Sequence, residues 1–146
     1  MIAVGGPAVN LVSHAYNPLL PFNLTVTEEY IELRVDWDGV AYIRYNFDPQ
    51  HYVLHYSNDT ETHYAFEDHD FTVVSVYFDS VNNKQVFFVM GMRADGTLGA
   101  CRYLASTLDS FASETANAEA LLLHWNDADS NGEANGDEMT SIATYP

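Results

Sequence analysis

Two stretches of the chain alternate between apolar and polar residues, which is the pattern of a half-buried β-strand. Residues 31–37 carry Ile, Leu, Val and Trp at every second position, and residues 41–45 carry Ala, Ile and Tyr in the same way. Asp38 and Gly39 lie between the two runs. Because an Asp-Gly pair between alternating runs is a strong signal for a two-residue turn, a β-hairpin is predicted here.

A second hairpin is predicted where the apolar runs are nearly continuous. The segments FTVVSVYF (71–78) and QVFFVM (85–90) flank the turn DSVNNK. Strands without alternation are typical of sheets that are covered on both faces. Residues 48–70 are instead polar, aromatic and rich in histidine, and they are predicted to form a loop with one short strand.

Helical spacing occurs twice. After a short apolar strand at 2–6, PAVNLVSHAY begins with a proline that suits a first helical turn. Residues 91–111 then place a set of apolar residues at helical spacing behind a glycine-bearing turn. That set consists of Leu98, Cys101, Leu104, Ala105 and Leu108. Near the end, AEALLLHW and MTSIATY resemble strands, although the first could equally be the end of a helix.

The segment between these last two runs is acidic and follows the spacing of a calcium loop. Counted from Asp127, it matches D-x-[DN]-x-[DN]-G-x₅-E, with Gly132 at the sharp bend. A hard cation needs six to eight oxygens, which alternate residues of a curled loop can supply. We therefore predict Ca²⁺ bound by loop 127–138, pinning a β-hairpin or a helix-to-strand connection. The predicted ligands are Asp127, Asp129, Asn131, Glu133 (through its carbonyl), Asn135 and Glu138. The competing interpretation is a solvated acidic turn.

Length and composition agree with one folded domain. The 146 residues are 47% hydrophobic and show no linker or internal repeat, so residues 1–146 are predicted to form a single compact domain. The predicted fold class is mixed α/β, with a mixed β-sheet of two hairpins, two main helices and the calcium loop. The lone Cys101 excludes an internal disulfide and is predicted to be buried.

The net charge of the chain excludes some classes of binding partner. Twenty-one acidic residues oppose five basic ones, which gives a formal charge of −16. Such a surface repels phosphate backbones and anionic lipid heads, so nucleic acid is not expected as a partner. The longest apolar runs are too short to cross a bilayer, and membrane insertion is not expected either. Two sequons, at Asn23 and Asn58, favour an exported protein with N-linked glycans.

Three segments together resemble the C-terminal region of archaeal S-layer proteins: IAVGGPAVNLVS, the stretch from FTVVSVYF to CRYLAS, and LLLHWNDADSNGEANGDE. The matching positions are Gly5, Gly6, Pro7, Val9, Asn10, Gly91, Gly96, Thr97, Ala100, Leu104, Ala105, Trp125, Asp127, Asp129, Asn131 and Gly132. The resemblance implies a cell-surface, non-enzymatic protein that self-associates into a lattice or filament, often glycosylated and steadied by divalent cations. Residues 20–70 match only loosely.

The histidine-rich segment leaves two interpretations open. The first is an aromatic, polar surface that contacts another subunit, since aromatic residues are enriched in interfaces. Its candidate residues are His51, Tyr52, His55, Tyr56, His63 and Tyr64. The second is a transition-metal site that uses His51, His55, His63 and His69 with neighbouring carboxylates.

Enzymatic and phosphate-binding functions have weaker signals. Ser, His and Asp are present, but no motif such as G-x-S-x-G joins them. The turn ADGTLGA could cradle a phosphate at a helix start, although helix–strand packing explains its glycines better. We therefore predict that the protein is not an enzyme. We expect an extracellular structural protein that self-assembles into a surface layer or filament. The alternative is a calcium-dependent glycan- or protein-binding module of a secreted or cell-surface protein.

Overall fold

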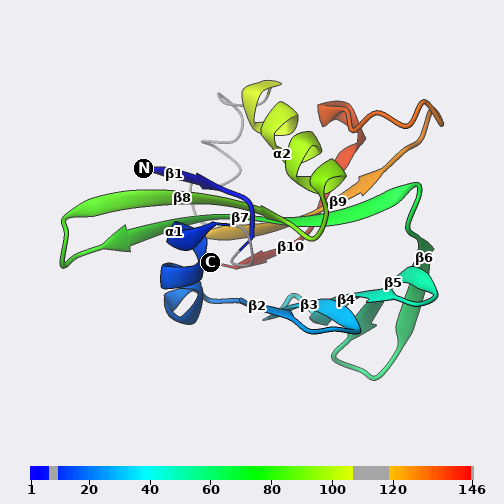
Figure 1. The fold of residues 1–146 in the computed structure, drawn as a ribbon, viewed down its shortest axis with the longest axis horizontal. Helices are drawn as coiled ribbons and strands as arrows, with labels where there is room; N and C mark the ends of the chain where they lie inside the picture. Colours follow the sequence, from blue (N-terminus) through cyan, green and yellow to red (C-terminus); the bar gives the residue numbers. More distant parts are fainter. Residues whose placement is uncertain (7–9, 107–118, 146) are drawn as a thin grey trace.

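Two five-stranded β-sheets lie face to face, and a helix covers part of the outer face of one of them (Figure 1). The computed structural model describes residues 1–6, 10–106 and 119–145. Sheet A has the order β1 (Ile2–Val4), β8 (Lys84–Gly91), β7 (His69–Asp79), β9 (Ala120–Asn126), β10 (Met139–Tyr145). Sheet B has the order β2 (Asn23–Val26), β3 (Tyr30–Trp37), β4 (Val40–Phe47), β5 (Gln50–Tyr56), β6 (Glu61–Ala65). The mixed α/β class and the single domain are confirmed, but the protein is mostly β.

The first predicted hairpin is confirmed in sheet B. Trp37 pairs with Val40, and Asp38 and Gly39 form the two-residue connection. Both of these residues have left-handed backbone angles, with φ of 48° and 81°. Two consecutive positive φ angles are what a type I′ turn requires, and this turn matches the twist of the strands it joins.

Residues 48–70 were expected to form a loop with one short strand, and this expectation is wrong. They contain two antiparallel strands, β5 and β6, which extend sheet B. The outward positions of these strands carry polar residues such as His51, His55 and His63. The average polarity of the segment therefore looks like that of a loop, although its inward positions, including Tyr52 and Leu54, are buried.

The second predicted hairpin, β7–β8, is also confirmed, but it lies in the other sheet. The expected single sheet of two hairpins is therefore wrong, because each hairpin belongs to a different sheet. β7 occupies the middle of sheet A, between β8 and β9, and is buried along most of its length. β1 pairs with β8 in parallel, whereas β9 and β10 are antiparallel, so the AEALLLHW segment is a strand.

The main core fills the space between the sheets. Leu33, Ile43 and Tyr52 from sheet B meet Phe71 and Phe88 from sheet A, and all five are fully buried. A second, smaller cluster lies on the opposite face of sheet A, under α2 (Ala94–Ser106). Where α2 covers sheet A, this double cover explains why the strands show no polar alternation.

Both predicted helices exist, with differences in detail. α1 (Leu11–Tyr16) begins after Asn10, whose Oδ1 accepts the N–H groups of Val12 and Ser13. Pro7 and Val9 of its predicted first turn lie outside the described residues. The described residues also contain two short 3₁₀ helices, η1 (Asn17–Leu19) and η2 (Gly136–Glu138).

The buried face of α2 differs from the predicted one. Leu98 is 46% exposed, and the buried positions are Gly96, Gly99 and Ala100. Small residues let the helix approach sheet A closely, so a larger apolar side chain has no room there. Cys101 is half-buried against the same cluster. Leu108 lies outside the described residues.

Candidate functional site

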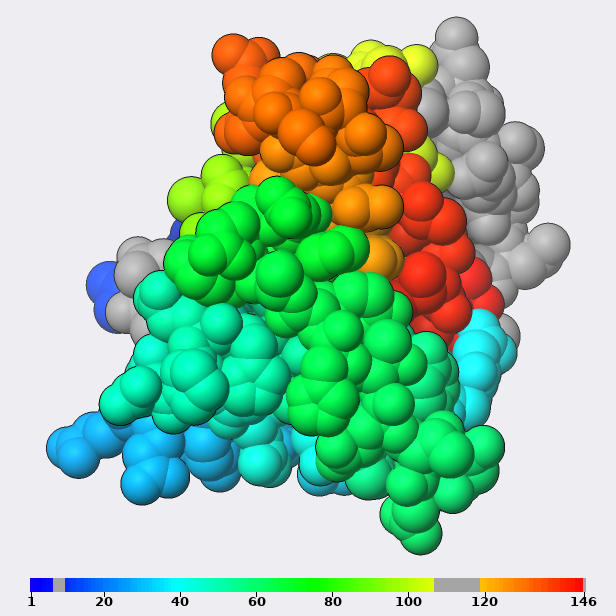
Figure 2. Space-filling view, turned by 90° about the vertical axis from the view of Figure 1, so that its right-hand side faces the viewer, coloured from blue at the N-terminus to red at the C-terminus, as the bar shows by residue number. Residues whose placement is uncertain are grey.

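The acidic loop connects β9 to β10 and lies on the surface, at the top of the space-filling view (Figure 2). Asp127, Asp129 and Glu138 each bring one carboxylate oxygen to within 4.8 Å of the others. Asp127 is buried, Glu138 is half-buried and Asp129 is exposed. These three residues form an acidic cluster that could hold a metal ion.

Hydrogen bonds from backbone N–H groups hold the carboxylate of Asp127 in place. The two oxygens of Asp127 accept the N–H groups of Asn131 and Gly132 at 3.1 and 2.9 Å. This arrangement needs a sharp turn, and Ser130 and Gly132 supply it with left-handed φ angles of 57° and 73°. The prediction that glycine permits the bend is confirmed at Gly132.

The last carboxylate, Glu138, connects the loop to the core. Its Oε1 accepts the N–H of Ala128, and its Oε2 accepts the indole N–H of Trp125, each at 3.1 Å. Trp125 is 1% exposed, so this bond fixes Glu138 to a rigid neighbour. The backbone N–H of Asn135 also donates to Glu138, in a capping box that starts η2.

The other predicted calcium ligands are engaged within the loop. Asn131 donates to Asp129 through Nδ2, and its Oδ1 accepts the N–H of Glu133. The side chain of Asn135 caps η2. Of the six predicted ligands, Asp127, Asp129 and Glu138 are brought together as a cluster that could hold a metal ion, and ligation by Asn131, Glu133 and Asn135 stays a prediction. Loss of solvation, followed by the charges of Glu138 and Asp127, raises the pKa of Asp129.

The loop also contacts helix α2. Arg102 donates from Nη1 to the carbonyl oxygen of Ala134 at 2.8 Å. Ala134 and Met139 belong to the apolar cluster beneath the helix. A Cβ at Gly136 would lie 2.8 Å from the backbone nitrogen of Tyr103, so loop and helix are in close contact. Order in the loop is thus coupled to the position of α2 on sheet A.

The six residues of the predicted histidine and tyrosine surface do not share one face. His51, His55 and His63 lie on the outer face of sheet B, whereas Tyr52 points into the core and is fully buried. A contact between Tyr52 and a partner is therefore excluded by burial. Tyr56 and Tyr64 are half-buried against the core as well.

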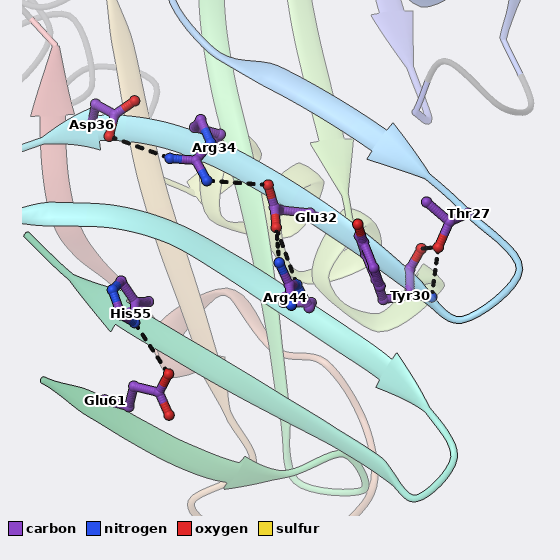
Figure 3. Close-up of polar contacts among 8 residues, drawn as sticks. All are labelled: Thr27, Tyr30, Glu32, Arg34, Asp36, Arg44, His55 and Glu61. Carbon is purple, nitrogen blue, oxygen red and sulfur yellow. Dashed lines mark hydrogen bonds and ion pairs between the residues drawn. The ribbon is translucent and has the colours of Figure 1, made fainter. Parts of the chain in front are cut away.

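The outer face of sheet B carries a network of charged and aromatic side chains that the sequence analysis missed (Figure 3). The guanidinium of Arg44 lies 4.3 Å from the ring centre of Tyr30, and its Nε donates to Glu32 at 3.1 Å. Arg34 lies over Tyr42, which stacks on His55 with ring centres 4.7 Å apart. The alternation of residues 32–36 and 42–44 was the available signal, because it places these polar side chains on one face.

A buried carboxylate, Asp70, ties α2 to both sheets. Its oxygens accept the hydroxyl of Tyr52 at 2.6 Å and the N–H groups of Phe71, Arg93 and Gly96. Burial raises its pKa to about 6, although these hydrogen bonds lower it. The anion at the start of α2 is thus the protein's own carboxylate, in agreement with packing as the role of the ADGTLGA turn.

His69 lies apart from the other predicted cluster residues. Its Nδ1 is 2.9 Å from Nε2 of His124, and the ring of His124 stacks on Phe71 with centres 4.5 Å apart. Burial, followed by the charge of His69, lowers the pKa of His124 to about 4. The sequence offered no sign of this pair, because its members are far apart along the chain.

Part of the outer face of sheet A is apolar and lies beyond α2. Cross-strand pairing places Ile2 beside Phe87 and Phe87 beside Val76, and Val4 and Phe78 follow on the same side of their strands. Ile2 is 72% and Phe78 59% exposed. We call these five residues, which α2 leaves exposed at Ile2, Val4 and Phe78 and half-buried at Val76 and Phe87, the bare apolar face. Sequence analysis did not find it, because continuous apolar strands gave no reason to expect exposure.

Both sequon asparagines are exposed. Asn23 lies in β2, and Asn58 lies in the turn between β5 and β6. Oδ1 of Asn58 accepts hydrogen bonds from the N–H and the hydroxyl of Thr60. Among residues 1–6, 10–106 and 119–145, no helix is both long and apolar enough to span a bilayer.

Comparisons with known proteins complete the description of the site. No family model, no curated protein and no solved structure matches this chain. The described residues offer three candidate functional surfaces: the acidic cluster, the bare apolar face and the outer face of sheet B.

Proposed function

We propose that this protein is an extracellular, non-enzymatic structural subunit that associates with copies of itself into a surface layer or filament and binds calcium in its C-terminal loop. The observation that carries the proposal is the bare apolar face of sheet A. In the part of the chain that the structure describes, three of its five side chains, Ile2, Val4 and Phe78, are exposed on neighbouring strands, and clustered exposed apolar side chains favour a contact site.

The position of this face favours an open assembly. The bare apolar face and the outer face of sheet B lie on opposite sides of the molecule (Figure 1). A subunit that joins others through two different surfaces forms a ring or an open chain, whereas a single self-complementary surface stops at a dimer. Contact between the bare apolar face of one copy and a second surface of the next would extend a filament or layer.

Calcium fits the acidic cluster by charge and by ligand type. Three carboxylates supply hard oxygen ligands, and loop carbonyls and water can complete a shell of six to eight. The ion would offset the mutual repulsion of Asp127, Asp129 and Glu138. Modules that work outside the cell bind calcium with dissociation constants of about 10⁻⁴–10⁻³ M, so a partly exposed site suits that environment. N-linked glycans on Asn23 and Asn58 would also be consistent with a location outside the cell.

The test of self-association compares two serine substitutions. Phe78→Ser removes the most exposed aromatic ring of the bare apolar face, whereas Val81→Ser removes a side chain that is 90% exposed in the β7–β8 turn. We expect ordered sheets or fibres of the wild type and of Val81→Ser by electron microscopy. Phe78→Ser should stay monomeric by light scattering, with an unchanged melting temperature. Monodisperse wild-type particles with calcium present would contradict the proposal.

A second candidate is a calcium-dependent binding module for glycans or a partner protein. It is favoured by the outer face of sheet B, where a hollow at one end is lined by Tyr30, Arg44, Asn46 and Phe47 together with carboxylates. Aromatic rings beside planar polar groups suit both sugars and protein surfaces. Monodisperse particles that bind a glycan array, with binding lost in Arg44→Ala, would select this function.

A further inference from the structure

Two histidines and a carboxylate share the outer face of strands β5 and β6. His55 pairs directly with Glu61 across the strands, and His63 follows Glu61 two residues later. Residues two apart on a strand point to the same side, as do direct cross-strand partners. The three side chains therefore form a compact group that local register holds together, and Figure 3 shows the first pair.

The distances within this group are those of ligands around a metal. Nδ1 of His55 lies 3.2 Å from Oε1 of Glu61, and Nε2 of His63 lies 3.3 Å from Oε2. Zinc binds imidazole nitrogen and carboxylate oxygen at about 2.0–2.2 Å in a tetrahedron, which separates two ligands by about 3.3 Å. Each imidazole–carboxylate pair thus already has the span of two ligands on one ion.

Neighbouring side chains prepare His55 for this role. Its ring stacks on Tyr42, and its side chain is only 18% exposed, so its orientation is restricted. Oδ1 of Asp59 lies 3.6 Å from Nε2, on the far side of the ring from Glu61. Histidines that bind a metal through one nitrogen commonly present the other to a carboxylate, which strengthens the ligand.

His63 supplies the adaptable part of the group. Its side chain is 59% exposed and stacks on His51 with ring centres 5.7 Å apart. Among the described residues, only the C-terminal cluster already brings three ligand atoms within 4.8 Å of one another. The two imidazole nitrogens approach different oxygens of Glu61, so closure requires the exposed ring of His63 to turn until both nitrogens can contact one ion.

We propose that His55, Glu61 and His63 bind a divalent transition-metal ion, with Zn²⁺ as the best fit and water in the remaining position. Imidazole nitrogen favours zinc, copper and nickel, whereas calcium prefers oxygen. This site is therefore chemically distinct from the C-terminal cluster and does not depend on the proposed assembly. The strongly acidic surface raises the local concentration of cations near both sites.

The test is a titration with Zn²⁺ by calorimetry in millimolar CaCl₂, which keeps the C-terminal cluster occupied. We expect one zinc ion per wild-type chain. Glu61→Gln and His63→Gln should each weaken zinc binding at least tenfold, and Co²⁺ should give the strong visible absorption of tetrahedral coordination in the wild type but not in these two variants. His14→Gln is the matched control, because His14 is exposed on α1, and it should bind zinc like the wild type.

Three outcomes would overturn the site: no zinc binding by the folded wild type, unchanged affinity in Glu61→Gln and His63→Gln, or loss of zinc in Asp129→Asn. The last would place the ion in the C-terminal cluster. The side chains of Glu61 and His63 are exposed, so their substitution should not unfold the protein. Thermal unfolding checks that the variants remain folded.

Discussion

Asp70 and His124 shape the response of the protein to acid at the scale of single residues. Asp70 is a carboxylate fully buried between the sheets and α2, and His124 lies half-buried against Phe71 and His69. Burial disfavours the charged form of each, so the pKa of Asp70 is raised to about 6 and that of His124 is lowered to about 4. Their effects on stability have opposite signs.

The signs follow from proton uptake. Below pH 6.5, an unfolded chain protonates His124 while the folded chain does not, so the unfolding free energy falls as the pH is lowered to about 4. Between pH 6 and 4, the folded chain protonates Asp70 while the unfolded chain does not, so the unfolding free energy rises. In this window the two titrations offset each other.

We predict that, in His124→Phe, the stabilising protonation of Asp70 is no longer offset by the titration of His124. The phenyl ring keeps the contact with Phe71 but takes up no proton. Lowering the pKa of His124 from 6.5 to about 4 corresponds to about 3 kcal/mol, which partial exposure of the ring reduces to about 1–2 kcal/mol. Relative to wild type, the variant should therefore gain about 1–2 kcal/mol of unfolding free energy between pH 7 and 4.5, measured in urea.

The unfolding free energy is compared as a function of pH for the wild type and His124→Phe. The other carboxylates titrate in both proteins, so the difference between the two curves reports the removal of the His124 titration. His14→Gln serves as the control, since His14 is exposed and its removal should leave the pH dependence unchanged. Parallel curves for wild type and His124→Phe would refute the prediction.

Residue partnerships of this kind could not be predicted from the sequence. Tyr52 lies in β5 and Asp70 in β7, and the bond between them exists only because sheet B faces sheet A. The pairing of His69 with His124 likewise depends on the neighbouring positions of β7 and β9. The acidic cluster was within reach of the sequence because its residues are close in the chain, whereas the hydrogen bonds that Asn131 and Asn135 make within the loop were not.

Local turn chemistry explains which elements were predictable. The Asp38–Gly39 hairpin and the β7–β8 hairpin pair strands that are neighbours in the sequence, so their turn residues and flanking runs can be recognised together. β5 and β6 were missed because one face of sheet B is open, and its histidines lower the apparent hydrophobicity of the strands. The division of the two hairpins between two sheets depends on contacts that no local pattern encodes.

The fit of α2 on sheet A gives a prediction at this scale. A Cβ at Gly96 would lie 2.6 Å from Oγ1 of Thr72 and 2.8 Å from the Asp70 carboxylate, and both neighbours are fully buried. Gly96→Ala should therefore destabilise the protein by about 2 kcal/mol, because the rigid neighbours cannot move aside.

Leu98→Ala is the matched control in the same helix. Leu98 is 46% exposed, so its truncation should cost less than about 0.5 kcal/mol. The unfolding free energies of both variants are measured in urea. A larger loss of unfolding free energy for Leu98→Ala than for Gly96→Ala would show that the helix packs through its leucine instead.

Calcium should act on the whole molecule, because the acidic loop contacts α2 and continues into β10. An ion that binds only the folded state contributes about 2.7 kcal/mol at a hundredfold excess over its dissociation constant. We predict that a chelator lowers the melting temperature of the calcium-loaded protein by several degrees.

Asp129→Asn provides the control for this measurement. Asp129 is exposed and bonds only within the loop, so the variant should fold but lose most of the response to chelator. An unchanged wild-type melting curve in chelator would contradict calcium binding at the cluster.

The strand order has a consequence for synthesis on the ribosome. Sheet B uses five strands in chain order, from Asn23 to Ala65, and each pairs with the next. Sheet A takes β1 and β10 as its two edges, so its last strand follows every other part of the described chain. A chain emerging from the exit tunnel can complete the meander of sheet B early, while the cover of its inner face must wait for translation to reach β9 and β10. During that interval the aromatic side of the meander is without its native neighbour.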